Sequence, residues 1–420
     1  MDDQVRPPMR LLGLDPNEVP LDQIDVSQAE LFEHGEHWAY LERLRREDPV
    51  HYCAVSDFGA YWSVTKFKDI AYVDKHHKIF SSEPTITISE PSEEVPFQSF
   101  IQMDPPKHDH QRAAVQGSVA PMNLAKYEEK IRGWAGDILD DLPVGEVFDW
   151  VPRVSVDLTA QMLATLFDVP FEDRLKLTYW SDVAAGSPEM TGNNMISEQD
   201  RAVELGKCMA YFAELWNRKV NAPPTNDIIS MLAHAESTKD LINNPVEFLG
   251  NLILLLVGGN DTTRNSISGG VLALNQFPDQ YQKLRDDPGL IPNMISEIIR
   301  WQTPVSSMTR RVTEDTELGG KKIRKGEKVV MWFISGNRDD EVISNPDELV
   351  IDRENARHHL SFGFGVHRCM GNRLAEMQLR IVWEEITKRF HKIEVMEEPL
   401  RTRSNMIHGY RQLMVKVHPL

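Results

Sequence analysis

The chain has 420 residues, of which 41% are hydrophobic, 26% charged and 8% aromatic, a composition typical of a globular protein with a sizeable core. Its 64 acidic residues outnumber the 46 lysines and arginines, and the net charge of -18 argues against a nucleic-acid partner, because such proteins carry basic faces. No segment has the apolar length of a signal peptide or a transmembrane helix, so we expect a soluble, cytoplasmic protein without a membrane anchor.

In chain order, a proline-rich N-terminus predicts a flexible arm over residues 1–25, and a β-hairpin is predicted over 50–65. A second β region is predicted over 317–333 and a last strand over 412–417. Irregular stretches at 81–102 and 184–194 have the length of functional loops. Helical patterns cover 36–47, 108–120, 124–141, 154–166, 197–220, 227–235 and 245–276. These elements predict one mainly α domain over residues 1–420, with a large helical part and a smaller β-containing part.

The best-defined helix is predicted over residues 245–276. Asn244 can cap it, Pro245 takes the first helical position, Glu247 can complete a capping box, and Phe277 precedes a proline that ends the helix. Such a helix is about 48 Å long. Its middle holds six poor helix formers, the run GGNDTT over residues 258–263. Either a loop separates two helices there, or one helix is weakened where something binds.

The densest motif surrounds one of the three cysteines. Cys53, Cys208 and Cys369 are too few and too widely spaced for a disulfide framework or a CxxC zinc site. Around Cys369 the chain reads FGFGVHRCMG, and apolar residues at helical spacing follow. Glycines let the backbone approach a bulky flat group closely, and a cysteine just before a helix N-terminus is favoured as a thiolate.

This ten-residue pattern resembles the haem-binding loop of the cytochrome P450 superfamily, in which the single cysteine is the axial thiolate ligand of the haem iron. The resemblance implies the cytochrome P450 fold, mainly α with small β-sheets, with haem b (iron protoporphyrin IX) between two helices. Cys369 is then the metal ligand, with Phe362 and Gly363 in the loop beside the cofactor. The alternative, an ordinary buried cysteine in a glycine-rich turn, is disfavoured by the further motifs that follow.

The resemblance also implies a buried Glu-x-x-Arg pair with a structural role. Six Glu-x-x-Arg pairs occur in the chain, and only Glu297 and Arg300 lie among apolar residues that indicate burial, where opposite charges must pair. Arg353 best matches the third member that the family places before the haem loop. The three residues are expected to fix the cysteine loop.

Four side chains match the family's haem-propionate ligands. His108 and Arg112 are four residues apart and share a helix face. Arg310 and His367 match two further contacts. Arg311 is an adjacent competitor for the role of Arg310, and each of these residues could instead be a solvated charge.

The family carries a small-Gly-x-acid-Thr cluster in the helix that crosses above the haem, and residues 258–262 match it at every position. Gly258 and Gly259 are expected to leave room for dioxygen. Thr262 can bond the carbonyl of Gly258 and open the helical ladder locally, and Asp261 can relay protons. In this interpretation one continuous helix contains poor helix formers at the place where dioxygen binds, and the helix-loop-helix alternative is disfavoured.

The resemblance implies a monooxygenase, in which a substrate C–H group, O2, two electrons and two protons give an alcohol and water. The electrons are expected from NAD(P)H through separate partners, an iron-sulfur ferredoxin and its flavin-dependent reductase, as in soluble bacterial members. Arg368 and Arg373 could meet an acidic partner on the cysteine side of the haem.

The amino-acid sequence of residues 257–270 and 362–378 most resembles that of the bacterial family members that oxidise terminal methyl groups of medium-chain alkanes, fatty acids and alcohols. Leu254, Val257 and Ser306 match pocket positions for a small apolar substrate, although an ordinary core role is equally compatible. A steroid side-chain or terpenoid hydroxylase is the alternative within the fold; the steroid branch usually has Glu in place of Asp261. A peroxygenase generally lacks the Asp261-Thr262 pair, and a non-catalytic haem protein such as a gas sensor needs no proton relay.

Overall fold

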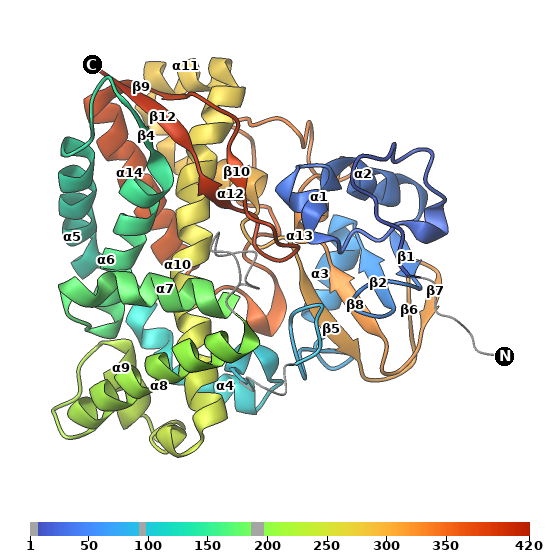
Figure 1. Cartoon of the computed structure of the whole chain (residues 1–420), viewed down its shortest axis with the longest axis horizontal. Coiled ribbons are helices and arrows are strands. Elements are labelled where there is room, and N and C mark those ends of the chain that lie inside the picture. The colour runs from blue at the N-terminus through green and yellow to red at the C-terminus, as the bar shows by residue number, and fades with distance from the viewer. Residues whose placement is uncertain (1–6, 92–97, 186–196) are drawn as a thin grey trace.

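The longest helix, α10 (Pro245–Gln276), runs through the helical part of the molecule (Figure 1). The computed structural model describes residues 7–91, 98–185 and 197–420. The Asn244 side chain accepts a hydrogen bond from the Glu247 N–H, so the predicted cap and both predicted ends of this helix are confirmed. The capping box is not completed, because the Glu247 carboxylate instead accepts hydrogen bonds from Lys107 and Gln111. The helix is unbroken through residues 258–263, so the helix-loop-helix alternative is wrong.

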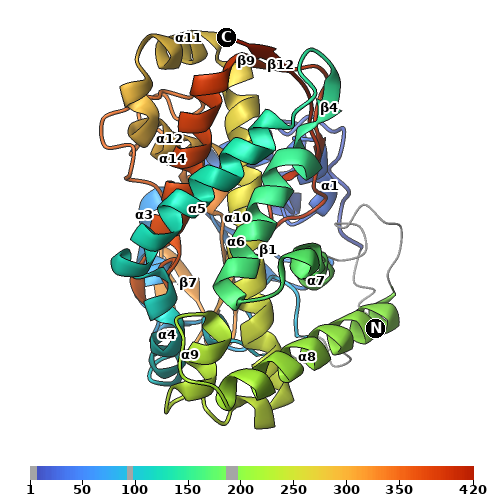
Figure 2. The same cartoon turned by 90° about the vertical axis from the view of Figure 1, so that its left-hand side faces the viewer.

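Other helices surround α10 in the helical part, and Figure 2 shows α5, α6 and α14 on one side of it, with α8 crossing near its lower end. These helices are α4 (Lys107–Gln116), α5 (Pro121–Asp140), α6 (Asp157–Phe167), α7 (Arg174–Ala185), α8 (Glu198–Val220), α9 (Ile228–His234), α11 (Pro278–Asp286), α12 (Ile291–Gln302) and α14 (Asn372–Arg389). Their apolar faces form the largest hydrophobic core, which includes Trp150, Trp216 and Trp383. The predicted helices 108–120, 124–141, 154–166, 197–220 and 227–235 are confirmed with shifted ends.

The smaller part is built on a five-stranded sheet with the order β1-β2-β8-β5-β3. Its strands are β1 (Val50–Cys53), β2 (Tyr61–Val64), β3 (Phe80–Ser81), β5 (Met308–Val312) and β8 (Lys328–Met331). The predicted hairpin is confirmed, since β1 and β2 pair antiparallel, whereas β2 and β8 pair parallel. The pairing of β2 with β8 joins segments that are more than 240 residues apart in the sequence. The helices of this part are α1 (Ala29–Glu33), α2 (His37–Glu47), α3 (Phe67–Lys75) and α13 (Phe333–Gly336), which lie beside the sheet (Figure 1).

Three smaller sheets complete the described structure. One has the order β4-β12-β9, formed by β4 (Val147–Asp149), β9 (Phe390–Val395) and β12 (Met414–Pro419). The others pair β10 (Leu400–Arg401) with β11 (Tyr410–Gln412), and β6 (Thr316–Leu318) with β7 (Lys321–Ile323). The predicted β region 317–333 thus divides into β6, β7 and β8, and the predicted last strand 412–417 divides between β11 and β12.

Several elements differ from the sequence-based predictions. The helices α1, α3, α7, α11, α12 and α13 were not predicted. Residues 184–185, expected to begin an irregular loop, end α7; residues 186–194 and 92–97 of the two predicted loops lie outside the described residues. The predicted arm differs too, because Leu11, Val19 and Ile24 are buried in a core with α1 and α2, and residues 1–6 lie outside the described residues.

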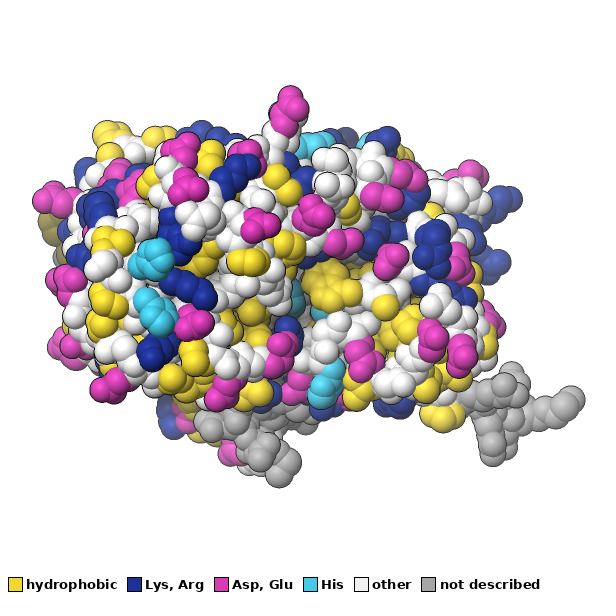
Figure 3. Space-filling view, turned by 90° about the horizontal axis from the view of Figure 1, so that it is seen from above, with side chains coloured by type: hydrophobic (Ala, Val, Ile, Leu, Met, Phe, Trp, Pro, Cys, Tyr) yellow, Lys and Arg dark blue, Asp and Glu magenta, His cyan; other side chains and the backbone are white. Residues whose placement is uncertain are grey.

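Charged side chains of both signs are interspersed over the face seen in Figure 3. Among the described helices, none is both long enough and apolar enough to cross a membrane.

Candidate functional site

A pocket of about 240 Å³ lies between α10 and the loop that precedes α14. The walls are mainly apolar, and side chains from α10, from residues 304–308 and from the N-terminal half of α14 contribute to them. The pocket therefore suits an apolar ligand held in place by the few polar groups described below.

Cys369 lies at the pocket wall, two residues before the cap of α14. Its thiol is exposed to the pocket, and its own N–H donates to the Phe362 carbonyl at 2.8 Å. Although the thiol faces the pocket, the pocket walls keep it from bulk water, and this desolvation raises its pKa, while the backbone N–H groups of Gly371 and Asn372 and the nearby Arg112 oppose that rise. A bound cation is what such a thiol needs to become a thiolate.

The described residues contain no group of three or more His, Cys, Asp or Glu side chains that could hold a metal ion. A metal macrocycle carries most of the ligands of its metal itself, so a single cysteine side chain such as that of Cys369 would be enough to hold it. Phe362 and Gly363 also line the pocket beside the cysteine.

Cationic and imidazole side chains gather at the same pocket. Arg112, Arg310 and His367 line it, and the His108 ring packs edge-on against His367 with centroids 4.4 Å apart. The His108 Nε2 atom and both ring nitrogens of His367 are buried and have no partner among the described atoms. Burial lowers the pKa of both histidines, so both rings are neutral. The Nδ1 atom of His108 lies 2.8 Å from the Asp109 carboxylate and so carries the proton of that neutral ring, which leaves Nε2 as an acceptor. The neutral His367 ring keeps one buried N–H without a partner among the described atoms. That N–H, together with the two arginines, fits a group that carries carboxylates, as haem does.

The adjacent arginines divide their roles. Arg310 is 1% exposed and faces the pocket, whereas one guanidinium nitrogen of Arg311 donates to both carboxylate oxygens of the exposed Glu90, at 2.8 and 2.9 Å. Of the two competitors, only Arg310 is placed to contact a pocket ligand.

The α10 wall of the pocket contains Gly258, Gly259 and Thr262. A Cβ on Gly258 would meet nothing within 4 Å, so this glycine leaves open space. A Cβ on Gly259 would lie 2.9 Å from Leu163, so this glycine also permits close packing of α6 on α10, which the sequence did not indicate. The Thr262 hydroxyl donates to the Gly258 carbonyl at 3.1 Å, as predicted, without interrupting the helix.

Asp261, next to Thr262 on α10, is not part of the pocket lining. It is 1% exposed and lines a second cavity of about 220 Å³ with Arg264 and Asp182. One Arg264 nitrogen lies 2.9 Å from Asp261 and 2.6 Å from Asp182, and Asn260 donates to Asp261 at 2.9 Å. Burial raises the pKa of Asp261 to about 6, with Asp182 reinforcing and Arg264 opposing the shift. The carboxylate and the Thr262 side chain therefore line different cavities, although the two residues are adjacent on one helix.

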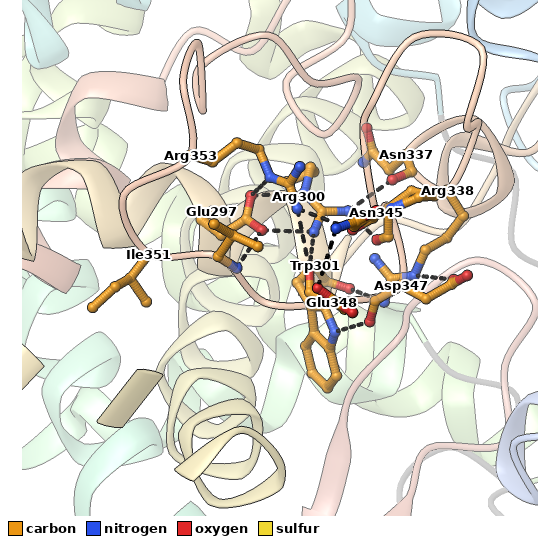
Figure 4. Close-up of polar contacts among 12 residues, drawn as sticks. Glu297, Arg300, Trp301, Asn337, Arg338, Asn345, Asp347, Glu348, Ile351 and Arg353 are labelled. Atoms are coloured by element: carbon orange, nitrogen blue, oxygen red, sulfur yellow. Dashed lines mark hydrogen bonds and ion pairs between the residues drawn. The ribbon is translucent and has the colours of Figure 1, made fainter. Parts of the chain in front are cut away.

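Glu297, Arg300 and Arg353 form one buried network (Figure 4). Arg300 donates twice to the Glu297 carboxylate, both at 2.8 Å, and Arg353 donates to it at 2.9 Å. Burial alone would raise the pKa of Glu297, but the two arginines and the Val350 N–H hold it below its ordinary value. The structure thus brings together the three residues that the sequence assigned to a structural role.

Asn337 connects this network to the cysteine loop and was missed by the sequence analysis. Its carbonyl accepts from Arg300 at 2.9 Å, and its side chain bonds the Leu360 N–H at 2.7 Å and the Ser361 hydroxyl at 2.9 Å. No motif in the sequence marks it, because its partners lie far away along the chain.

Of the three predicted substrate-contacting residues, one lines the pocket and two do not. Leu254 lines the pocket, one turn before Gly258 on α10. Val257 and Ser306 are not among the pocket residues; Val257 packs against the large core, and the Ser306 hydroxyl is buried without a partner among the described atoms. Val305 and Met308 line the pocket instead of Ser306.

Comparison with known proteins identifies relatives that are similar to this chain over nearly its whole length. The family model described as Cytochrome P450 matches residues 289–412. The linalool 8-monooxygenase of Pseudomonas putida is 36% identical over 413 residues, which cover 95% of this chain and all of that protein. The methyl-branched lipid omega-hydroxylase of Mycobacterium tuberculosis is 31% identical over 423 residues, 97% of each chain.

Two solved structures are similar over nearly their whole length. Cytochrome P450-153 from Novosphingobium aromaticivorans has a TM-score of 0.87 and 42% identity, covering 94% of this chain and 99% of that one. CYP153D17 from Sphingomonas sp. PAMC 26605 has a TM-score of 0.88 and 44% identity, covering 95% of this chain and all of that one.

Proposed function

Because this chain belongs to the cytochrome P450 family and is a monooxygenase, we propose that it hydroxylates the terminal methyl group of a medium-chain alkane, fatty acid or alcohol. Two kinds of observation support this choice. The pocket is lined mainly by apolar side chains, which suit a hydrocarbon chain. A relative named as an omega-hydroxylase of methyl-branched lipids spans 97% of the chain.

The cofactor we propose is haem b, held by Cys369 as the axial ligand and by His108, Arg112, Arg310 and His367 at its carboxylates. The unpartnered N–H of His367, the two arginines of the pocket lining and the presence of Cys369 in that lining support this assignment. A haem with a thiolate ligand supplies the oxygen and redox chemistry of the reaction.

The residues of α10 then handle space and protons. Gly258 leaves room beside the Thr262 hydroxyl, and Leu254, one turn away, presents an apolar side chain to the substrate. Asp261 has a pKa raised to about 6, which suits a group that must both hold and release a proton near neutral pH. We assign it the transfer of protons from the second cavity toward the Thr262 side of the helix. The apolar walls keep bulk water away from the reacting centre.

Electrons are proposed to come from NAD(P)H through an iron-sulfur ferredoxin and its flavin-dependent reductase. Arg368 and Arg373 are exposed next to Cys369 and are suited to an acidic partner.

The observation that carries the substrate proposal is the mainly apolar lining of the pocket. It is tested by product analysis with ferredoxin, reductase, NADH and a mixture of octane, fatty acids and sterols. Terminal alcohols of the linear substrates are the expected products, whereas exclusive oxidation of the sterols would contradict the proposal.

A terpenoid is the second candidate substrate, favoured by the 36% identity to a linalool 8-monooxygenase. Adding linalool to the same mixture distinguishes the two candidates by which compound is consumed first.

A further inference from the structure

Asp74 is a buried carboxylate that neither the sequence motifs nor the proposed reaction uses. It lies in the last turn of α3, is 4% exposed and lines the main pocket. Its Oδ1 atom accepts from Arg310 at 2.8 Å, and its Oδ2 atom accepts from the Phe364 N–H at 2.7 Å. Among the described residues that line this pocket, it is the only Asp or Glu.

The cysteine loop is shaped around this carboxylate. Gly363 and Gly365 have φ values of +65° and +68°. A Cβ on Gly363 would lie 3.0 Å from Asp74 Oδ2, and one on Gly365 would lie 2.5 Å from the Asp74 carbonyl oxygen. These glycines therefore serve the close approach of α3 as well as the pocket.

We propose that Asp74 is a positioning residue that fastens the cysteine loop to Arg310 before the cofactor binds. One carboxylate oxygen holds the loop five residues before Cys369, and the other holds the guanidinium that faces the pocket. The inference rests on the proposed function in one respect, namely that this loop binds haem through Cys369.

The chemistry of both partners allows this double role. A guanidinium has five N–H donors, of which the Thr309 carbonyl and Asp74 each take one, so Arg310 can hold Asp74 and a cofactor carboxylate together. A carboxylate accepts both bonds with its two oxygens, whereas an amide has one acceptor oxygen. Asp74 also places a negative charge at the pocket wall, which disfavours the addition of an electron to a group bound there.

Three variants separate this role from a general loss of charge. Asp74→Asn keeps the shape but loses the charge and one accepted bond. Asp74→Glu keeps the charge, yet its extra methylene must displace the loop that packs against the carboxylate. Asp69→Asn is the matched control, because it removes a carboxylate from the same helix outside the pocket.

Hydrogen-deuterium exchange at the Phe364 amide, measured on the full chain without haem, tests the fastening itself. We expect exchange about ten times faster in Asp74→Asn and Asp74→Glu than in wild type, since a hydrogen bond to a charged group is lost or strained. Transfer of haem from the loaded protein to apomyoglobin should accelerate by about the same factor. In Asp74→Asn alone, the reduction potential should become more positive.

Asp74→Asn that matches Asp69→Asn and wild type in amide exchange and haem loss would overturn the inference. The amide measurement needs no haem. It therefore tests whether Asp74 holds the cysteine loop, independently of whether Cys369 binds haem. If the amide exchanges faster in the variants but wild type binds no haem through Cys369, the proposed function is wrong and the positioning of the cofactor by Asp74 falls with it.

Discussion

At the scale of single residues, the least expected feature is the placement of Asp261 on a second cavity, away from the pocket that Thr262 lines. The sequence predicts that the two residues act together but not that they line different cavities. A helix turns by about 100° per residue, so the residue at the edge of a pocket-lining face can be adjacent to one that points elsewhere: Thr262 and Thr263 line the pocket, whereas Asp261 lines the second cavity. The same geometry excludes Val257 from the pocket while Leu254 and Gly258 line it.

The raised pKa of Asp261 predicts a pH dependence of stability. Its ordinary value is 3.8 and its folded value about 6, so the folded state binds its proton more tightly. The stability contributed by protonated Asp261 is fully present below about pH 4 and is lost as pH rises through about 6. Asp261→Asn is neutral throughout. The free energy of unfolding of wild type minus that of Asp261→Asn, measured by urea titration, should therefore fall between pH 4 and 6. A difference that stays constant with pH would contradict the raised pKa.

Thr262→Ala should separate electron consumption from product formation. The hydroxyl is expected to support proton delivery, so its loss should lower the product formed per NADH consumed by roughly tenfold, the scale of one hydrogen bond in a transition state, and raise peroxide release. Thr263→Ala, which alters the next residue in the same pocket lining, is the control and should stay coupled. Full coupling in Thr262→Ala removes the role assigned to the hydroxyl.

At the scale of elements, the two adjacent glycines of α10 should respond differently to alanine. Gly258→Ala places a methyl group in open space and gains up to about 1 kcal/mol of helix propensity. Gly259→Ala pushes against Leu163 of α6, and overpacking costs about 1–3 kcal/mol. Denaturant unfolding should therefore rank Gly258→Ala above Gly259→Ala in stability. The reverse order would contradict the packing described for α6 and α10.

The network around α12 predicts a large effect from one conservative change. Glu297→Gln leaves two buried arginines short of their counter-charge, which costs about 3–5 kcal/mol of unfolding free energy. The chain offers a matched control in Glu398→Gln, because the Glu398–Arg401 pair has the same spacing at 2.7 Å but a carboxylate that is 75% exposed. The control should cost less than about 1 kcal/mol. Equal effects of the two changes, measured by urea titration, would argue against the structural role of the buried network.

At the scale of the whole molecule, the sequence predicted what is coded locally. The capping residue Asn244 and the prolines at both ends predicted the bounds of α10, and apolar residues at helical spacing predicted the helix that follows Cys369. The contacts that were missed join distant segments. Asp74 meets Arg310 and Phe364 across 236 and 290 residues, and such hydrogen bonds leave no periodic trace in a sequence.

The central claim is that Cys369 provides the thiolate ligand of a haem. The most direct test is the absorption spectrum of the reduced, CO-bound protein, compared among wild type, Cys369→Ser, Cys53→Ser and Cys208→Ser. Cys53 and Cys208 are buried outside the pocket lining. Wild type and the two control variants should show the strongly red-shifted Soret band of thiolate-ligated haem, and Cys369→Ser should lose it. An unshifted band in wild type, or a red-shifted band in Cys369→Ser, would contradict the assignment.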